Sequence, residues 1–163
     1  MGDTTFKMAQ EMPDSNFLAV EVHSPGVGSL LNKINLSQLE NLKIIQHDAI
    51  EVMNEMIPNR SLDGIHIFFP DPWPKKKHHK RRLLKNSFLE LMEMKLNQSG
   101  YIHIATDWEA YALKIITLVE ESKFYKISKR DLNEKPQSRP LTKYESRGLR
   151  LGHQVWDIVV TLS

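Results

Sequence analysis

The chain has 163 residues, of which 40% are hydrophobic and 26% charged, a composition typical of a globular domain with a single hydrophobic core. It contains no cysteine, which excludes disulfides, thiolate nucleophiles and cysteine-ligated zinc. No apolar run approaches the roughly 20 residues of a membrane span, and the first residues lack the pattern of a secretory signal peptide. We therefore expect a cytoplasmic protein.

Strand-like and helix-like segments alternate along the chain. Strands are predicted at residues 17–22, 42–46, 63–69, 101–105, 124–127 and 154–162. Helices are predicted at residues 6–12, 29–36, 50–57, 83–96 and 110–122. Residues 23–28 and the long polar stretch 130–152 read as loops, and residues 97–100 read as a helix stop. This order predicts one α/β domain over residues 1–163, with a Rossmann-like, doubly wound, mostly parallel sheet and helices on both faces.

Residues 65–74 organise the rest of the chain. They begin as an apolar strand and continue into Pro70, Pro72 and Pro74, which cannot donate to a sheet and which restrict the residues before them. Asp71 is therefore expected on a stiff, extended tip at a strand end, where open α/β sheets bind ligands. Seven lysines and arginines follow between residues 75 and 85, with no acid before Glu90.

A lysine-rich run is usually only a solvated face. Here the run directly follows a rigid tip that carries a carboxylate and an indole. Of the 22 basic residues seven lie in this run, which leaves 15 against 20 acidic residues in the rest of the chain. A basic patch on an otherwise acidic body is the electrostatic footprint of a phosphate-binding surface.

Three further acids, Glu21, Asp48 and Asp107, lie at or just after strand ends, and with Asp71 they would line one edge of the sheet. An acid after a strand is a weak sign of a ribose-binding carboxylate. The seven histidines show no metal-ligand spacing, and no metal is expected.

Residues 68–82 resemble the signature of the tRNA (guanine-N7)-methyltransferases. These are S-adenosylmethionine-dependent, Rossmann-like enzymes that methylate a guanine in the variable loop of tRNA. Four more blocks, at residues 21–28, 48–49, 106–108 and 142–148, are similar to family elements in the same order, so the resemblance spans essentially the whole chain.

The resemblance implies a role for each matching residue. Asp71 would lie at the reacting centre as the catalytic residue. The S-adenosyl-L-methionine site would comprise Gly2, Glu21, Asp48, Ala49 and Asp71. The guanosine would contact Lys75, Asp107, Thr142, Lys143, Tyr144 and Glu145. The arm that binds tRNA would comprise Lys76, Lys77, His78, Lys80, Arg81 and Arg82.

The start of the chain departs from the family pattern, because Met1 and Gly2 resemble the last residues of the family's glycine-rich loop. We expect an N-terminally truncated domain that binds the cofactor weakly alone. Three repairs of the sheet are conceivable: pairing of the strands at residues 17–22 and 63–69, rearrangement of the N-terminal segment, or a homodimer in place of a monomer. The dimer is favoured because strongly apolar helix faces need cover.

Two other functions stay open on the residues alone. An exocyclic-amine nucleic-acid methyltransferase also uses proline-rich, aromatic strand ends, but the basic arm and residues 142–145 argue against it. A non-catalytic RNA-binding fragment is supported chiefly by the absent start of the domain.

Overall fold

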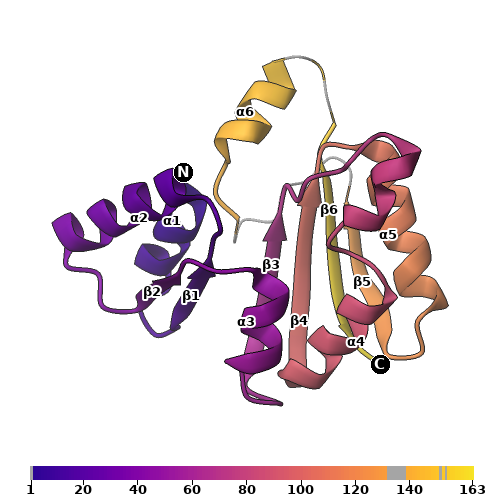
Figure 1. The fold of residues 1–163 in the computed structure, drawn as a ribbon, viewed down its shortest axis with the longest axis horizontal. Helices are drawn as coiled ribbons and strands as arrows, with labels where there is room; N and C mark the ends of the chain where they lie inside the picture. Colours follow the sequence, from indigo (N-terminus) through magenta and orange to yellow (C-terminus); the bar gives the residue numbers. More distant parts are fainter. Residues whose placement is uncertain (1, 132–138, 151, 153) are drawn as a thin grey trace. The chain divides into compact units, whose positions relative to one another are not determined.

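The chain folds into two compact units in the computed structural model, which describes residues 2–131, 139–150, 152 and 154–163 (Figure 1). Unit 1 comprises Met1–Met56 and Gln137–Thr142. Unit 2 comprises Ile57–Pro136 and Lys143–Ser163.

Unit 1 is a two-stranded parallel sheet with three helices. Its elements are α1 (Asp3–Glu11), β1 (Phe17–Val20), α2 (Ser24–Ser37), β2 (Leu42–Ile45) and α3 (Ala49–Glu55). The strands pair in register from Phe17 opposite Leu42 to Val20 opposite Ile45. The small core joins α1, α2 and β2 through Ala9, Leu30 and Leu42. Both strands of unit 1 therefore form within the apolar runs at residues 17–22 and 42–46 that predicted them.

Helix α2 begins five residues before the predicted start at residue 29. The stretch expected to be a loop carries Pro25 in the first helical turn, and Gly26 and Val27 are already buried. Proline is favoured there because the first turn has no use for its missing N–H and its φ is already helical. The prediction of a loop at residues 23–28 is therefore wrong.

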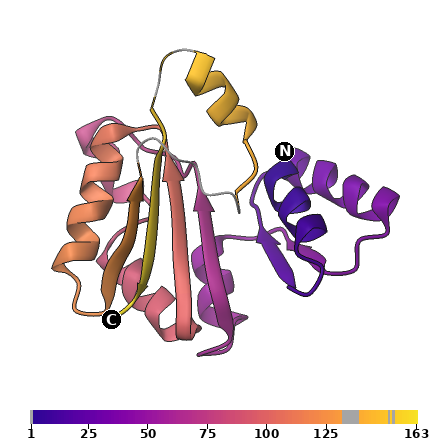
Figure 2. The same cartoon turned by 180° about the vertical axis from the view of Figure 1, so that it is seen from behind.

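Unit 2 is a four-stranded mixed sheet in the order β3-β4-β6-β5 (Figure 2). The strands are β3 (Leu62–Phe68), β4 (Leu96–Thr106), β5 (Tyr125–Asp131) and β6 (Trp156–Leu162). Strand β6 runs antiparallel to both β4 and β5, whereas β3 and β4 are parallel. Three of the four strands therefore point the same way, which confirms the α/β, mostly parallel prediction. Among the described residues β1 pairs with β2 and not with β3, so one of the three conceivable repairs, pairing of the strands at residues 17–22 and 63–69, is absent.

Two helices of unit 2 lie between strands of its sheet in the chain order, one between β3 and β4 and one between β4 and β5. They are α4 (Asn86–Lys95) and α5 (Glu109–Glu121), and α5 packs on β4, β5 and β6. Both carry the apolar faces that their periodicity predicted, with Phe88 and Met92 buried on α4 and Tyr111 and Ile115 on α5.

Strand β4 starts earlier than predicted, because residues 97–100 belong to it and are not a helix stop. Its pairing with β3 shifts between Leu62 and Gly64, and a β-bulge of this kind lets the strand absorb the polar residues. At Gly64 a Cβ would lie 2.7 Å from the Tyr101 ring, so glycine lets that ring pack against the strand.

The predicted polar loop at residues 130–152 contains helix α6 (Lys143–Arg150). Residues 132–138, 151 and 153 lie outside the described part. The helix has a signal in the sequence, since Thr142 and Glu145 have the spacing of a capping box at a helix start. The prediction of an unbroken loop is therefore wrong over this helix.

A cluster of buried and half-buried polar side chains lies on the β3, β4 and β6 strands of unit 2. His103 Nε2 is 2.7 Å from Asp157 Oδ1, and both side chains are almost fully buried. His66 Nε2 is 2.8 Å from the Tyr101 hydroxyl, and the His66 ring stacks on Phe68 with centroids 5.4 Å apart. Burial, and then the neighbouring His103, lower the pKa of His66 from 6.5 to about 4. His66 is therefore neutral at physiological pH, and its Nε2 shares a hydrogen bond with the Tyr101 hydroxyl.

This shift makes the stability of the protein depend on pH. The unfolded chain protonates His66 below pH 6.5, whereas the folded chain does so only near pH 4. The free energy of unfolding should therefore rise with pH between about 4 and 6.5, by at most on the order of 3 kcal/mol, and the contribution is complete above 6.5. Urea unfolding over this pH range should show a clearly smaller rise in His66→Gln, but an unchanged one in the control His79→Gln, whose side chain is exposed. Equal rises in the wild type and His66→Gln would contradict the assignment.

Candidate active site and basic arm

Residues 69–74, which we call the tip, follow β3 directly. The Phe69 N–H donates to the Ala105 carbonyl at 2.7 Å, so the tip starts as a continuation of the β3–β4 pairing. Phe69 and Trp73 then adopt φ values of 53° and 41°, although each precedes a proline. The expected extended tip is therefore wrong: the chain turns at both residues. Left-handed φ at non-glycine residues is costly and is often kept at functional sites.

Asp71 is an exposed residue in the middle of the tip. Its Oδ1 accepts from the Trp73 N–H at 3.0 Å, which closes a small turn around the carboxylate. Asp107 directly follows β4, the parallel neighbour of β3, so both acids lie at the same end of the unit 2 sheet. This end is where open α/β sheets bind ligands.

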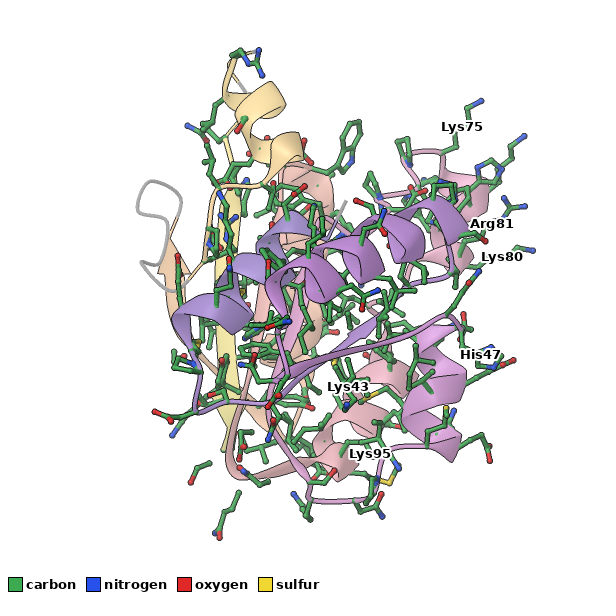
Figure 3. All side chains as sticks on the ribbon, turned by 90° about the vertical axis from the view of Figure 1, so that its left-hand side faces the viewer. Lys43, His47, Lys75, Lys80, Arg81 and Lys95 are labelled. Atoms are coloured by element: carbon green, nitrogen blue, oxygen red, sulfur yellow. The ribbon has the colours of Figure 1, made fainter. Side chains whose placement is uncertain are left out.

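The basic arm, residues 75–85, forms a short 3-10 helix, η1 (Lys76–Arg81), behind the tip. Trp73 joins the tip to the arm, because the Arg81 guanidinium lies 4.9 Å from its ring centroid and the His78 ring meets it edge-on at 5.7 Å. Figure 3 shows Lys75, Lys80 and Arg81 projecting outward from the ribbon. The cations exposed on the arm are Lys75, Lys76, Lys77, Lys80, Arg81 and Lys85.

Arg82 differs from the other cations of the arm. It is only 7% exposed, its Nε donates to the Pro72 carbonyl at 2.7 Å, and its guanidinium lies 4.6 Å from the Tyr111 ring centroid. A guanidinium held in this way is not presented to a phosphate. The role of Arg82 in the tRNA-binding arm therefore stays a prediction, although the side chain is buried and its contacts lie within unit 2.

The residues expected to hold the cofactor's ribose and adenine lie at the strand ends of unit 1. The Glu21 N–H donates to the Ile45 carbonyl, which extends β1 by one residue, and Glu21 Oε1 accepts from the His23 N–H at 2.9 Å. Asp48 caps α3, because its Oδ1 accepts from two N–H groups of the first turn, and Ala49 is the first residue of that helix. Glu21 and Asp48 thus stand at the carboxyl ends of neighbouring parallel strands.

Gly2 forms the turn at the start of α1. Its φ is 76°, and a Cβ at this position would lie 3.0 Å from two carbon atoms of the Leu30 side chain. Glycine is therefore the residue that this turn accepts, as in loops where backbone approaches a bound molecule closely.

The block from Thr142 to Glu145 contributes two buried polar side chains. Thr142 is 7% exposed and Glu145 is 3% exposed, and Glu145 lies in the first turn of α6. The side chains of Lys143 and Tyr144 lie outside the described part. Thr142 and Glu145 are thus part of a folded segment and do not lie on an open polar loop.

Metal binding and membrane insertion have no candidates in the described part of the chain. No group of three or more His, Asp or Glu side chains there could hold a metal ion. No helix among those residues is long and apolar enough to cross a bilayer.

Comparison with known proteins identifies relatives over nearly the whole chain. Residues 1–158 match the sequence family described as "Putative methyltransferase". The chain is 52% identical over 159 residues to a tRNA (guanine-N(7)-)-methyltransferase of Methylobacillus flagellatus, covering 98% of this chain and 67% of that protein. It is 50% identical over 161 residues to the protein of the same name from Nitrosomonas europaea, covering 99% and 72%.

Solved structures agree on the fold. A SAM-dependent methyltransferase from Aquifex aeolicus superposes with a TM-score of 0.58 at 12% identity, over 89% of this chain and 68% of that chain. A likeness at this identity concerns the fold alone and confirms its Rossmann-like class. On the match over residues 1–158 and the identity of about half of all positions with its relatives, the chain belongs to the tRNA (guanine-N(7)-)-methyltransferase family.

Proposed function

We propose that the chain transfers a methyl group from S-adenosyl-L-methionine to N7 of a guanine in the variable loop of tRNA. The observation that carries the proposal is the junction in unit 2 of an exposed carboxylate tip with an arm of exposed cations, in a member of this family. The arm would bind the RNA backbone and the tip would address a base.

The chemistry suits a site without a general base. Guanine N7 has a lone pair and no proton, so no proton has to be removed when it gains a methyl group. The cofactor supplies an electrophilic methyl group when it is bound. Positioning and electrostatics are then the main sources of rate enhancement. Positive charge develops on the purine, and the Asp71 carboxylate would stabilise it.

The residues of unit 1 would hold the cofactor. Glu21 would accept hydrogen bonds from the ribose hydroxyls, and Asp48 with Ala49 would lie beside the adenine. The Gly2 turn would approach the methionine end. These roles follow from the family resemblance, and the φ of Gly2 and the position of Glu21 at the end of β1 support them.

The test is methyl transfer to unmodified tRNA with the methylated position mapped. The expected product is N7-methylguanosine in the variable loop, formed in proportion to S-adenosylhomocysteine. Binding of tRNA without any methylation, under conditions where calorimetry shows bound cofactor, would favour the non-catalytic RNA-binding alternative. Methylation of an exocyclic amine would favour the other enzyme class.

Asp107 is the acid that we propose to read the guanine edge. It is half-buried and lies at the same end of the sheet as Asp71. A carboxylate can accept from both N1–H and the N2 amine of guanine. Asp107→Asn should therefore lower kcat/KM by about 10²-fold, because it leaves donors of the buried base unpaired.

Inosine at the target position gives the matched control, because it lacks only the N2 amine. The wild type should prefer guanosine to inosine by about 10-fold or more, and Asp107→Asn should lose most of that preference. An unchanged preference in the variant would assign the reading of guanine to another residue, with Glu145 the next candidate.

The family also bears on the cellular location. A tRNA-modifying enzyme acts where tRNA is, so we propose the cytoplasm. The prediction of a monomer or homodimer, with the dimer favoured, stays a prediction, and sedimentation of the purified chain tests it. The prediction of a single domain also stays a prediction.

A further inference from the structure

We infer that Arg82 is a positioning residue for Asp71, which holds the tip in place from inside unit 2 and does not contact phosphate. The inference rests on the proposed function of Asp71. Its basis is the geometry of one guanidinium between the tip and helix α5.

The first contact of Arg82 is with the tip. Its Nε donates to the carbonyl of Pro72, the residue directly after Asp71, at 2.7 Å. The three prolines of the tip have no backbone N–H, so they cannot fix the tip by donating hydrogen bonds. Their backbone can be held only through carbonyls that accept hydrogen bonds from other groups. A charged donor makes this bond stronger than a neutral one. The orientation of the peptide next to Asp71 is therefore coupled to Arg82.

The second contact of Arg82 is with helix α5. The guanidinium lies 4.6 Å from the ring centroid of Tyr111, which is fully buried. The Tyr111 hydroxyl also accepts from the Leu84 N–H at 3.2 Å. The Tyr111 side chain therefore contacts the arm at Leu84 and at Arg82, and through Arg82 it supports the tip.

The charges around Tyr111 agree with this arrangement. Burial raises the pKa of the Tyr111 hydroxyl, while the nearby Arg82 lowers it and the nearby Asp71 raises it. Arg82 and Asp71 thus act in opposite directions on the pKa of the same phenol.

Arginine is required at this position for a geometric reason. Its planar group can donate in its plane through Nε while its face packs on an aromatic ring. A lysine ammonium offers one compact charge and cannot make both contacts in this way. If Arg82 bound phosphate, lysine would largely replace it.

The test compares Arg82→Met and Arg82→Lys with the control Lys114→Met, which removes one cation from an exposed position of the same helix as Tyr111. At saturating tRNA and cofactor, kcat should fall about 10- to 100-fold in Arg82→Met, because a small misplacement of a reacting group is costly. Arg82→Lys should recover little of this loss. The Kd for tRNA should change by less than about 3-fold in both variants, and Lys114→Met should match the wild type.

A second measurement reports on the tip without any activity. In protein labelled with 5-fluorotryptophan, the fluorine resonance of Trp73, assigned with Trp73→Phe, should shift or broaden in both Arg82 variants. The resonance of Trp156 in β6 should stay unchanged, which shows an intact sheet. This readout remains valid if the methyl-transfer reaction differs from the one proposed. A failure of the inference about Arg82 can therefore be distinguished from a failure of the proposed function.

Three outcomes would overturn the inference. One is a weaker Kd for tRNA with unchanged kcat, restored by Arg82→Lys. Another is an unmoved Trp73 resonance, and the third is a moved resonance with normal kcat. If Arg82→Met does not fold, Arg82→Lys and Tyr111→Phe carry the test. Tyr111→Phe keeps the ring beneath the guanidinium and removes only the acceptor of the Leu84 N–H, so it should lower kcat less than Arg82→Lys.

Discussion

Asp71→Ala should lower kcat for methyl transfer by about 10²–10³-fold, while the fold and the Kd for tRNA stay nearly unchanged. The physical reason is the loss of a fixed negative charge where positive charge develops on the purine, since preorganised electrostatic groups have effects of this size. Asp71 is exposed in the middle of the tip, so its removal creates no cavity. Single-turnover rates at saturating cofactor and tRNA are the measurement, with circular dichroism as the check on folding.

Asp71→Asn separates the charge from the turn. An asparagine side-chain oxygen can still accept from the Trp73 N–H, as Asp71 Oδ1 does at 3.0 Å, so the tip should keep its shape. If the charge is responsible, Asp71→Asn should be nearly as slow as Asp71→Ala. If the turn is responsible, Asp71→Asn should be close to the wild type. Normal rates in both variants would remove Asp71 from the mechanism.

Charge reversal on the arm should weaken the binding of every tRNA to a similar extent. If three to five of the exposed cations meet phosphates, the plot of log K against log salt for the wild type should have a slope of roughly −2 to −4.5. The triple variant of Lys76, Lys77 and Lys80 to Glu should flatten that slope by about 2 to 3 and weaken binding by about 10²-fold or more at low salt. Arg81 is left in place because it packs on Trp73.

The control for the arm is the same number of reversals on another surface. Lys114, Lys123 and Lys126 are exposed on and after helix α5, and their reversal changes the net charge equally. That variant should keep most of the salt slope, because only cations close to the RNA release counterions. An equal loss in both triple variants would mean that net charge, and not the arm, governs binding.

Several features of the fold were predictable because their causes are local. Apolar runs of β-branched and aromatic residues mark the strands, and helical spacing marks α4 and α5. The family signature in residues 68–82 located the tip and the arm in the same way. Pro25 in the first turn of α2 and the capping-box spacing at residues 142–145 are local signals too, and they would have corrected two of the wrong boundaries.

The sequence by itself determined the α/β class, the family and the contiguity of Asp71 with a cationic arm, because periodicity, composition and a linear motif carry these properties. Only the tertiary structure decided which charges of that motif are exposed and which are buried. Arg81 and Arg82 are adjacent and chemically identical, yet one is exposed beside Trp73 and the other is buried between Pro72 and Tyr111. Tyr111 lies about 30 residues further on, and a contact at that separation is set by the packing of α5 on the sheet. No local pattern encodes it.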